Sequence, residues 1–354
     1  MKILCITPMS DKIKTPETGF AELLSTKHDV VLVYTGYNTN EVVINRQVVD
    51  FKPDVIWGMM EYALPTALYY KKLTGAPLYS HIECIPPWRT GIDDPKEYGF
   101  DYDDKFGEIS NPEFMKVFYK DIIDCFNQSD SRSISGNEWR YTFEKVTGEK
   151  LDADARYYTF NAAHLEKYMG KHKKKNQIFT ISRFSPIKRI HHIIKALSRI
   201  PKDKRPVYKV IGYGEQEKYL KNLAKTLEVE VDFVGTGQDG VKEKIIQESL
   251  FGIQIFSGIP VIEAAFFGVP VISYDTPHMV EVYGKMATWT KTNDIEALSN
   301  KIEEFLDNPE TVTLAAERAL ISLVDGSTNV NTNDQFIEAV EKLLYKAIEA
   351  QKNE

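Results

Sequence analysis

Charged side chains beside predicted strand ends in the second half of the chain have the types and spacing that bind a phosphorylated ligand. Arg183 directly follows a predicted strand at 178–182, and Lys188 precedes the helix after it. Glu263 lies early in an apolar helix that begins near Gly258. Guanidinium and ammonium groups bind phosphate oxygens, and a carboxylate accepts hydrogen bonds from ribose hydroxyls. On charge alone, the two cations would be ordinary surface charges flanking a loop, and Glu263 an acid favoured by the helix dipole.

Small residues near those charges would let a ligand approach the backbone. Gly212 and Gly235 each stand at the end of a predicted strand, and Gly258 and Ile259 begin the helix that carries Glu263. Backbone N–H groups at a helix start suit a diphosphate, and glycines leave room for a flat base. A short Gly-x-Gly is common by itself, and the full dinucleotide-binding fingerprint is absent from the sequence. Two cations, glycines and one acid together predict a nucleotide-sugar site.

The elements that must position these residues alternate between strand and helix. Such alternation predicts a doubly wound α/β domain, in which ligands bind at the carboxyl ends of the strands. In the second half we predict strands at 178–182, 207–211, 231–234, 253–256, 269–274 and 286–289. Apolar residues at helical spacing predict helices at 190–200, 219–227, 241–250 and 294–306, besides the short helix of Glu263.

The first half repeats the pattern and predicts a second parallel sheet with helices on both faces. Its strands are predicted at 1–6, 30–34, 55–59, 77–82 and 132–134. A short strand at 157–160 and the turn after it mark a domain boundary. We therefore predict two Rossmann-like domains that face a cleft, residues 1–158 and residues 159–333. The amphipathic helix at 334–354 is expected to pack back on the first domain.

The composition is that of a globular protein long enough for two cores, with 43% hydrophobic and 27% charged residues among 354. A net charge of −7 argues against general nucleic-acid binding, which needs a basic surface. The three cysteines are widely spaced among apolar residues, which predicts buried free thiols in a reducing compartment. The N-terminal MKILCITP is too short for a signal sequence or a membrane span, so we expect a cytoplasmic protein. The sequence shows no cluster of Asp and His residues that would bind a metal ion, so we expect no metal site.

Several segments resemble the retaining glycosyltransferases of family 4, also called glycosyltransferase group 1, which have the GT-B fold. The most specific match is EAAFFGVPVISYDTPHMVEV, which is similar to the family's EAMACGxPVIASDxGGxxEVV. SRFSPIKR resembles the family's GR-x-x-x-x-KG segment, and VIGYGE and VDFVGTG resemble two of its strand ends. TFNAAH resembles its interdomain turn, and LYSHIE resembles the strand that presents a histidine to the sugar. The resemblance covers the second domain well and the first in outline.

The resemblance implies roles for individual residues. Arg183 and Lys188 would hold the donor diphosphate, Glu263 would bind the ribose, and His81 would lie at the donor sugar. His81 could equally be a histidine whose hydrogen bonds are satisfied at a strand end. The donor would be a nucleotide-diphosphate sugar, linked to UDP or GDP, and the reaction would need neither a metal nor a separate cofactor.

The sequence departs from the family pattern at the donor site. Ile255 stands where the family has an earlier glutamate that binds the sugar, and the loop before Gly258 is shortened. Arg189 replaces the glycine that follows the family's lysine. Pro277 and His278 replace a pair of glycines. These changes leave open which sugar is bound and how fast the enzyme turns over.

Our first hypothesis is a retaining transferase that moves a sugar from the nucleotide donor to an acceptor bound by the first domain. The alternatives are a GT-B epimerase or phosphorylase, and a pseudoenzyme that binds a nucleotide sugar without turnover. The acceptor could be a sugar, a lipid or a protein, and the loop at 86–104 is expected to form its wall or lid. The aromatic residues Trp139, Tyr141 and Phe143 are expected in the core, with a peripheral membrane contact as the alternative.

Overall fold

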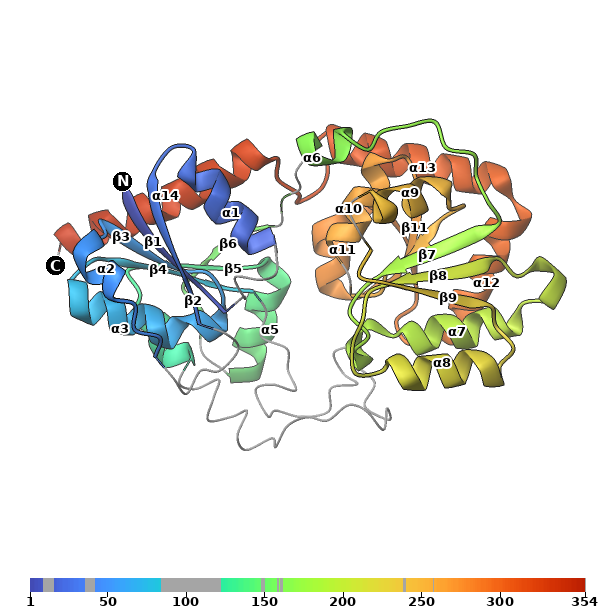
Figure 1. The fold of residues 1–354 in the computed structure, drawn as a ribbon, viewed down its shortest axis with the longest axis horizontal. Coiled ribbons are helices and arrows are strands. Elements are labelled where there is room, and N and C mark those ends of the chain that lie inside the picture. The colour runs from blue at the N-terminus through green and yellow to red at the C-terminus, as the bar shows by residue number, and fades with distance from the viewer. Residues whose placement is uncertain are drawn as a thin grey trace. The chain divides into compact units, whose positions relative to one another are not determined.

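The described residues form two compact units (Figure 1). A computed structural model describes residues 1–8, 16–35, 42–83, 122–147, 150–157, 159, 162–237, 240–256 and 258–353. Unit 1 contains the described residues up to Tyr157 together with those from Asn333 onward, and unit 2 contains those from Thr159 to Thr332. The chain therefore returns to its first unit after completing the second.

Unit 1 is built on a six-stranded parallel sheet in the order β2-β1-β3-β4-β5-β6. Its strands are β1 (Lys2–Thr7), β2 (Asp29–Tyr34), β3 (Val55–Gly58), β4 (Leu78–Ile82), β5 (Ser131–Ile134) and β6 (Asp154–Ala155). Every residue of β3 and β4 is buried, as in a parallel sheet covered on both faces. Of the strand predicted at 157–160, only Tyr157 and Thr159 are among the described residues; Thr159 forms an isolated parallel bridge with Asn331, and β6 lies earlier in the chain.

Helices cover both faces of this sheet. They are α1 (Pro16–Ser25), α2 (Arg46–Phe51), α3 (Leu64–Thr74), α5 (Asn137–Thr147) and α14 (Asn333–Lys352). On one face, Trp57 and Tyr79 of the sheet share a core cluster with Val340 and Leu344 of α14. On the other face, α3 packs in a cluster that includes Tyr70. The last helix, drawn in red in Figure 1, is thus part of the core of unit 1.

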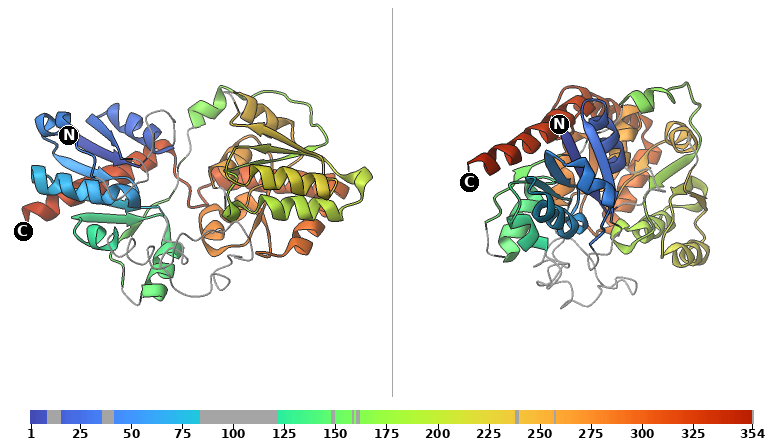
Figure 2. Two further views of the ribbon diagram at one scale, coloured as in Figure 1. Left: turned by 60° about the horizontal axis from the view of Figure 1, so that its bottom comes forward. Right: turned by 60° about the vertical axis from the view of Figure 1, so that its left-hand side comes forward.

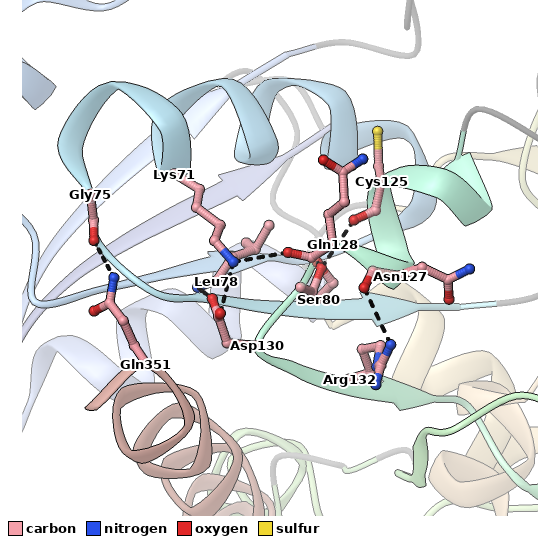
Figure 3. Close-up of polar contacts among 11 residues, drawn as sticks. Lys71, Gly75, Leu78, Ser80, Cys125, Asn127, Gln128, Asp130, Arg132 and Gln351 are labelled. Carbon is pink, nitrogen blue, oxygen red and sulfur yellow. Dashed lines mark hydrogen bonds and ion pairs between the residues drawn. The ribbon is translucent and has the colours of Figure 1, made fainter. Parts of the chain in front are cut away.

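Polar contacts fix the amino end of β4 to the helices around it (Figure 3). The Asp130 carboxylate accepts a hydrogen bond from the N–H group of Leu78 and forms an ion pair with Lys71 of α3, both at 2.7 Å. Gln351, near the end of α14, donates a hydrogen bond to the carbonyl of Gly75, which ends α3. The Gln351 bond adds a polar contact to the apolar packing of α14.

Unit 2 has a second six-stranded parallel sheet, in the order β12-β11-β10-β7-β8-β9. Figure 2 shows this unit, coloured from green to orange, from two further directions. Its strands are β7 (Gln177–Ile181), β8 (Val207–Ile211), β9 (Val231–Gly235), β10 (Gly252–Ile253), β11 (Val271–Tyr274) and β12 (Ala287–Thr290). Counted from β7, this is the strand order of the dinucleotide-binding doubly wound fold. Its topological switch point lies between β7 and β10.

The helices of unit 2 follow its strands in sequence. They are α6 (Ala162–Glu166), α7 (Ile190–Arg199), α8 (Glu217–Thr226), α9 (Val241–Glu248), α10 (Ile259–Phe266), α11 (Pro277–Tyr283), α12 (Ile295–Asp307) and α13 (Pro309–Val324). The structure adds α11 and α13 to the helices that the sequence predicted, and α6 lies where a turn was expected. Both units have the doubly wound α/β fold expected from the alternation of strands and helices.

Replacing Leu344 of α14 by alanine should lower the free energy of unfolding by about 2–5 kcal/mol, because this fully buried side chain would leave a cavity. Tyr345→Ala is the control, since the side chain of Tyr345 is 50% exposed and surface changes cost about 0.5 kcal/mol or less. Denaturant unfolding followed by circular dichroism measures both. Equal stability of the two variants would contradict a core position for α14.

Candidate functional site

Lys188 joins the two loops that border the switch point of unit 2. It ends the short 3-10 helix η4 (Pro186–Lys188), which follows β7, and its ammonium group donates a hydrogen bond to the carbonyl of Phe256. Phe256 follows β10, so this bond spans the place where doubly wound sheets bind their ligands. The sequence prediction that Lys188 lies at this edge is consistent with the structure, which also holds its side chain in place.

The backbone beside this contact is left-handed at two residues that are not glycine. The φ angle is +51° at Arg189 and +53° at Phe256. Glycine adopts such angles readily, whereas other residues do so at a cost of about 1–2 kcal/mol. Arg189 stands where the resembling family has a glycine. The left-handed backbone at this position explains why a glycine suits it. Strained backbone of this kind gathers at ligand sites.

Arg183 differs from Lys188 in being available to a ligand. It follows β7 and is exposed, and its guanidinium group forms no hydrogen bond or ion pair with any residue that the structure describes. The two predicted phosphate-binding cations therefore differ in their contacts within the protein. Lys188 has a partner within the protein, and Arg183 has none among the described residues.

The glycine pair after β8 has a packing role. A Cβ atom at Gly212 would lie 1.9 Å from the carbonyl oxygen of Ser182, and one at Gly214 would lie 2.6 Å from that of Phe184. The N–H group of Gly212 donates to the carbonyl of Gly235 at 2.8 Å. By contrast, no heavy atom lies within 4 Å of a Cβ built at Gly235. Close packing accounts for Gly212 without a ligand, while Gly235 has open space beside it.

The start of α10 offers two backbone donors. Gly258 precedes the helix and Ile259 is its first residue, and neither N–H group donates to a described residue. Pro260, at the second position, has no N–H group to satisfy. A Cβ atom at Gly258 would collide with the hydroxyl of Tyr283, at 1.8 Å. Glycine is therefore required where the chain turns into the helix.

Glu263, which the sequence shows as a solitary acid on an apolar helix, has a partner. Its Oε1 atom accepts a hydrogen bond from the Lys242 ammonium of α9 at 2.6 Å. Its Oε2 atom has no partner among the described residues. Glu263 is 8% exposed, and a buried carboxylate normally needs such compensation. Lys242 is the residue that sequence reasoning missed.

Other buried polar groups at this edge lack hydrogen-bond partners within the described part of the chain. Each follows a different strand, β7, β8, β10 or β11, and they are the hydroxyl of Ser185, the side-chain amide of Gln216, the Nε2 group of Gln254 and the hydroxyl of Thr276. Both Gln216 and Gln254 are fully buried. Buried polar atoms in folded proteins almost always have partners. The carboxyl edge of the unit 2 sheet therefore has unused hydrogen-bonding capacity that a ligand or water would fill.

His81 lies in unit 1, on β4, and is completely buried. Arg156 Nε donates to His81 Nδ1 at 3.3 Å, which assigns the ring proton to Nε2. Nε2 lies 3.2 Å from the Glu83 carboxylate and 3.0 Å from the Ser135 hydroxyl. Burial and the nearby Arg156 charge lower the pKa of His81 to about 4, against the effect of Glu83. Both ring nitrogens are engaged, as the alternative of a satisfied histidine predicted.

His81 should make unit 1 less stable in mild acid. Because its pKa is about 4 in the folded chain and 6.5 ordinarily, only the unfolded chain takes up the proton between these values. Stability from this group is present above pH 6.5 and is lost as the pH falls towards 4. We expect wild type to lose about 2 kcal/mol more than His81→Gln between pH 7 and pH 5. Urea unfolding at both pH values measures the difference; identical losses would contradict a neutral, buried His81.

Some sequence predictions lie outside the described residues or stay open. The loop at 86–104 and the side chain of Phe143 are outside them. Trp139 is 7% exposed and Tyr141 is 53% exposed, so only the first lies in the core. In the described ranges, no group of three or more His, Cys, Asp or Glu residues could hold a metal ion. None of the helices in those ranges combines the length and apolar character needed to cross a membrane.

Comparison with known sequences supports a glycosyltransferase. Residues 164–320 match the family described as Glycosyl transferases group 1. A relative from Haemophilus influenzae, described as an uncharacterized glycosyltransferase, is 29% identical over 126 residues, or 33% of this chain. The match spans 35% of that relative, about a third of its length.

Solved structures share the fold over nearly the whole chain. The Anabaena protein HepE in complex with UDP-glucose has a TM-score of 0.69 at 16% identity, covering 97% of this chain and 100% of HepE. Sucrose-phosphate synthase from Thermosynechococcus elongatus has a TM-score of 0.73 at 11% identity, covering 99% of this chain and 100% of that protein. With its two parallel sheets, the chain therefore has the GT-B fold that the resemblance predicted.

Proposed function

We propose that this protein is a retaining glycosyltransferase that takes a sugar from a nucleotide-diphosphate donor bound by unit 2. The observation that carries the proposal is the Glu263 carboxylate, buried at the carboxyl edge of the sheet with Oε1 paired and Oε2 without a partner. A single acceptor oxygen at this edge suits a ribose hydroxyl, which is a donor.

The diphosphate would be bound by groups at the same edge. Arg183 has no partner among the described residues, and the N–H groups of Gly258 and Ile259 lie at a helix start. Lys188 would add its charge on releasing or sharing the carbonyl of Phe256. Preorganised donors of this kind stabilise the negative charge that develops on a leaving diphosphate. They would do so without a metal ion.

The donor is proposed to carry uridine diphosphate. HepE, which shares the fold, is solved in complex with UDP-glucose, and this supports UDP over GDP as the first nucleotide to test. The acceptor, a sugar, lipid or protein, is assigned to unit 1 because, apart from His81, the groups proposed to bind the donor lie in unit 2. A cytoplasmic location is part of the same proposal.

A second candidate is a protein that binds a nucleotide sugar without turning it over. The observation that favours it is Ile255, which stands where the resembling family has its sugar-binding glutamate. Its side chain is 1% exposed and belongs to the core of unit 2. No carboxylate is therefore available at that position. Release of UDP from UDP-glucose, with and without a mixture of acceptors, separates the two candidates.

Arg183→Ala should weaken binding of UDP by about ten- to a hundredfold, because a charge-assisted contact of this kind contributes about 1.5–3 kcal/mol. UMP should be less affected, and uridine should not be affected at all. Arg199→Ala is the matched control, since Arg199 is also exposed but lies at the other end of α7. Calorimetric titration of each variant gives the affinities. Wild-type affinity for UDP in Arg183→Ala would exclude Arg183 from the donor site.

A further inference from the structure

We propose that Lys242 is a positioning residue of the nucleotide site, which holds Glu263 so that its second carboxylate oxygen receives the ribose diol. The inference rests on the proposed function and extends it to a residue outside the motifs of the resembling family. Lys242 is the second residue of α9, and Glu263 is the fifth residue of α10. The two helices follow different strands of the sheet, so the ion pair joins two separate loops of the ligand-binding edge.

The contact between the two side chains is short and partly shielded from water. The Lys242 ammonium lies 2.6 Å from Glu263 Oε1, with side-chain exposures of 26% and 11%. Burial acts to lower the pKa of Lys242, but Glu263 and Glu243 outweigh it, and the net pKa is raised. The ammonium is therefore firmly charged at neutral pH.

A second acid fixes the other side of the ammonium. Glu243 Oε1 lies 3.5 Å from Lys242 Nζ, and Glu243 Oε2 accepts a hydrogen bond from the N–H group of Gly240 at 3.1 Å. His164 of α6 lies 3.9 Å from the same Glu243 carboxylate. Glu243 therefore caps the start of its own helix, α9. Of the two acids beside Lys242, only Glu263 keeps an oxygen without a partner among the described residues.

The surroundings of Glu263 make such a partner necessary. Its helix reads Ile-Pro-Val-Ile-Glu-Ala-Ala-Phe, and the residues on both sides of the acid in sequence, Ile262 and Ala264, are fully buried. A carboxylate in this setting requires a compensating partner. The Lys242 ammonium supplies it at Oε1 and so restricts rotation of the carboxylate.

The test compares UDP with 2′,3′-dideoxyuridine diphosphate, which lacks the diol, by calorimetric titration. Wild type should prefer UDP by about tenfold or more, as expected for loss of hydrogen bonds to a charged group. In Lys242→Met the ratio of the two affinities should fall towards one, as in Glu263→Gln. Lys242→Arg should keep most of it, because the charge remains. Lys244→Met, an exposed lysine on the same helix, is the control and should behave as wild type.

The double variant Lys242→Met with Glu263→Gln covers the case in which Lys242→Met alone does not fold, because it removes both charges. Its preference for UDP should equal that of Glu263→Gln alone. If Lys242→Met weakens both nucleotides equally and keeps the preference, Lys242 only supports the fold. If it binds UDP more tightly than wild type, Lys242 competes with the ribose. Wild-type protein that binds neither UDP nor GDP would instead overturn the proposed function, and this inference with it.

Discussion

A parallel sheet covered on both faces leaves its carboxyl edge as the place where polar side chains can gather. The inner strands β3 and β4 of unit 1 and β7 and β11 of unit 2 are buried almost throughout, and their backbone groups pair with neighbouring strands. Beyond the strand ends the backbone is free to turn, and side chains from distant parts of the sequence meet. In unit 2 the bond from Lys188 to the carbonyl of Phe256 joins the loops on either side of the switch point. The positions of the other site residues depend on those loops.

The two units use this edge differently. In unit 1, His81 is enclosed by Ser133, Ser135, Glu83 and Arg156, and its two ring nitrogens are both occupied. In unit 2, both polar atoms of the buried Gln216 side-chain amide and the N–H₂ group of Gln254 have no partner within the described residues. Buried polar groups that hydrogen-bond to one another stabilise the fold. Buried polar groups without partners favour the binding of a molecule that hydrogen-bonds to them. This contrast supports assigning the donor nucleotide to unit 2.

The sequence alone was enough to place most strands and to put Arg183, Lys188 and Glu263 at strand ends, since these follow from local periodicity. It was not enough to find Lys242, which lies 21 residues from Glu263 on another helix. The only signal was an acid buried among apolar residues, which implies a partner without naming it. The packing reason for Gly212 was also hidden, because Ser182 contacts it from the neighbouring strand end. The two-residue strand β6 is too short to leave a periodic pattern.

The proposed donor site has groups that suit a nucleotide, but an apolar residue stands at the position expected to approach the sugar. Arg183, the start of α10 and the pair of Lys242 with Glu263 all suit the nucleotide and its phosphates. The position that would approach the sugar carries Ile255, whose side chain is buried in the core and cannot be rotated outward without leaving a cavity. Under the proposed function, affinity for the nucleotide and discrimination among sugars would therefore depend on different parts of this chain. Binding can persist even where turnover is slow, which is why nucleotide titration and donor turnover have to be measured separately.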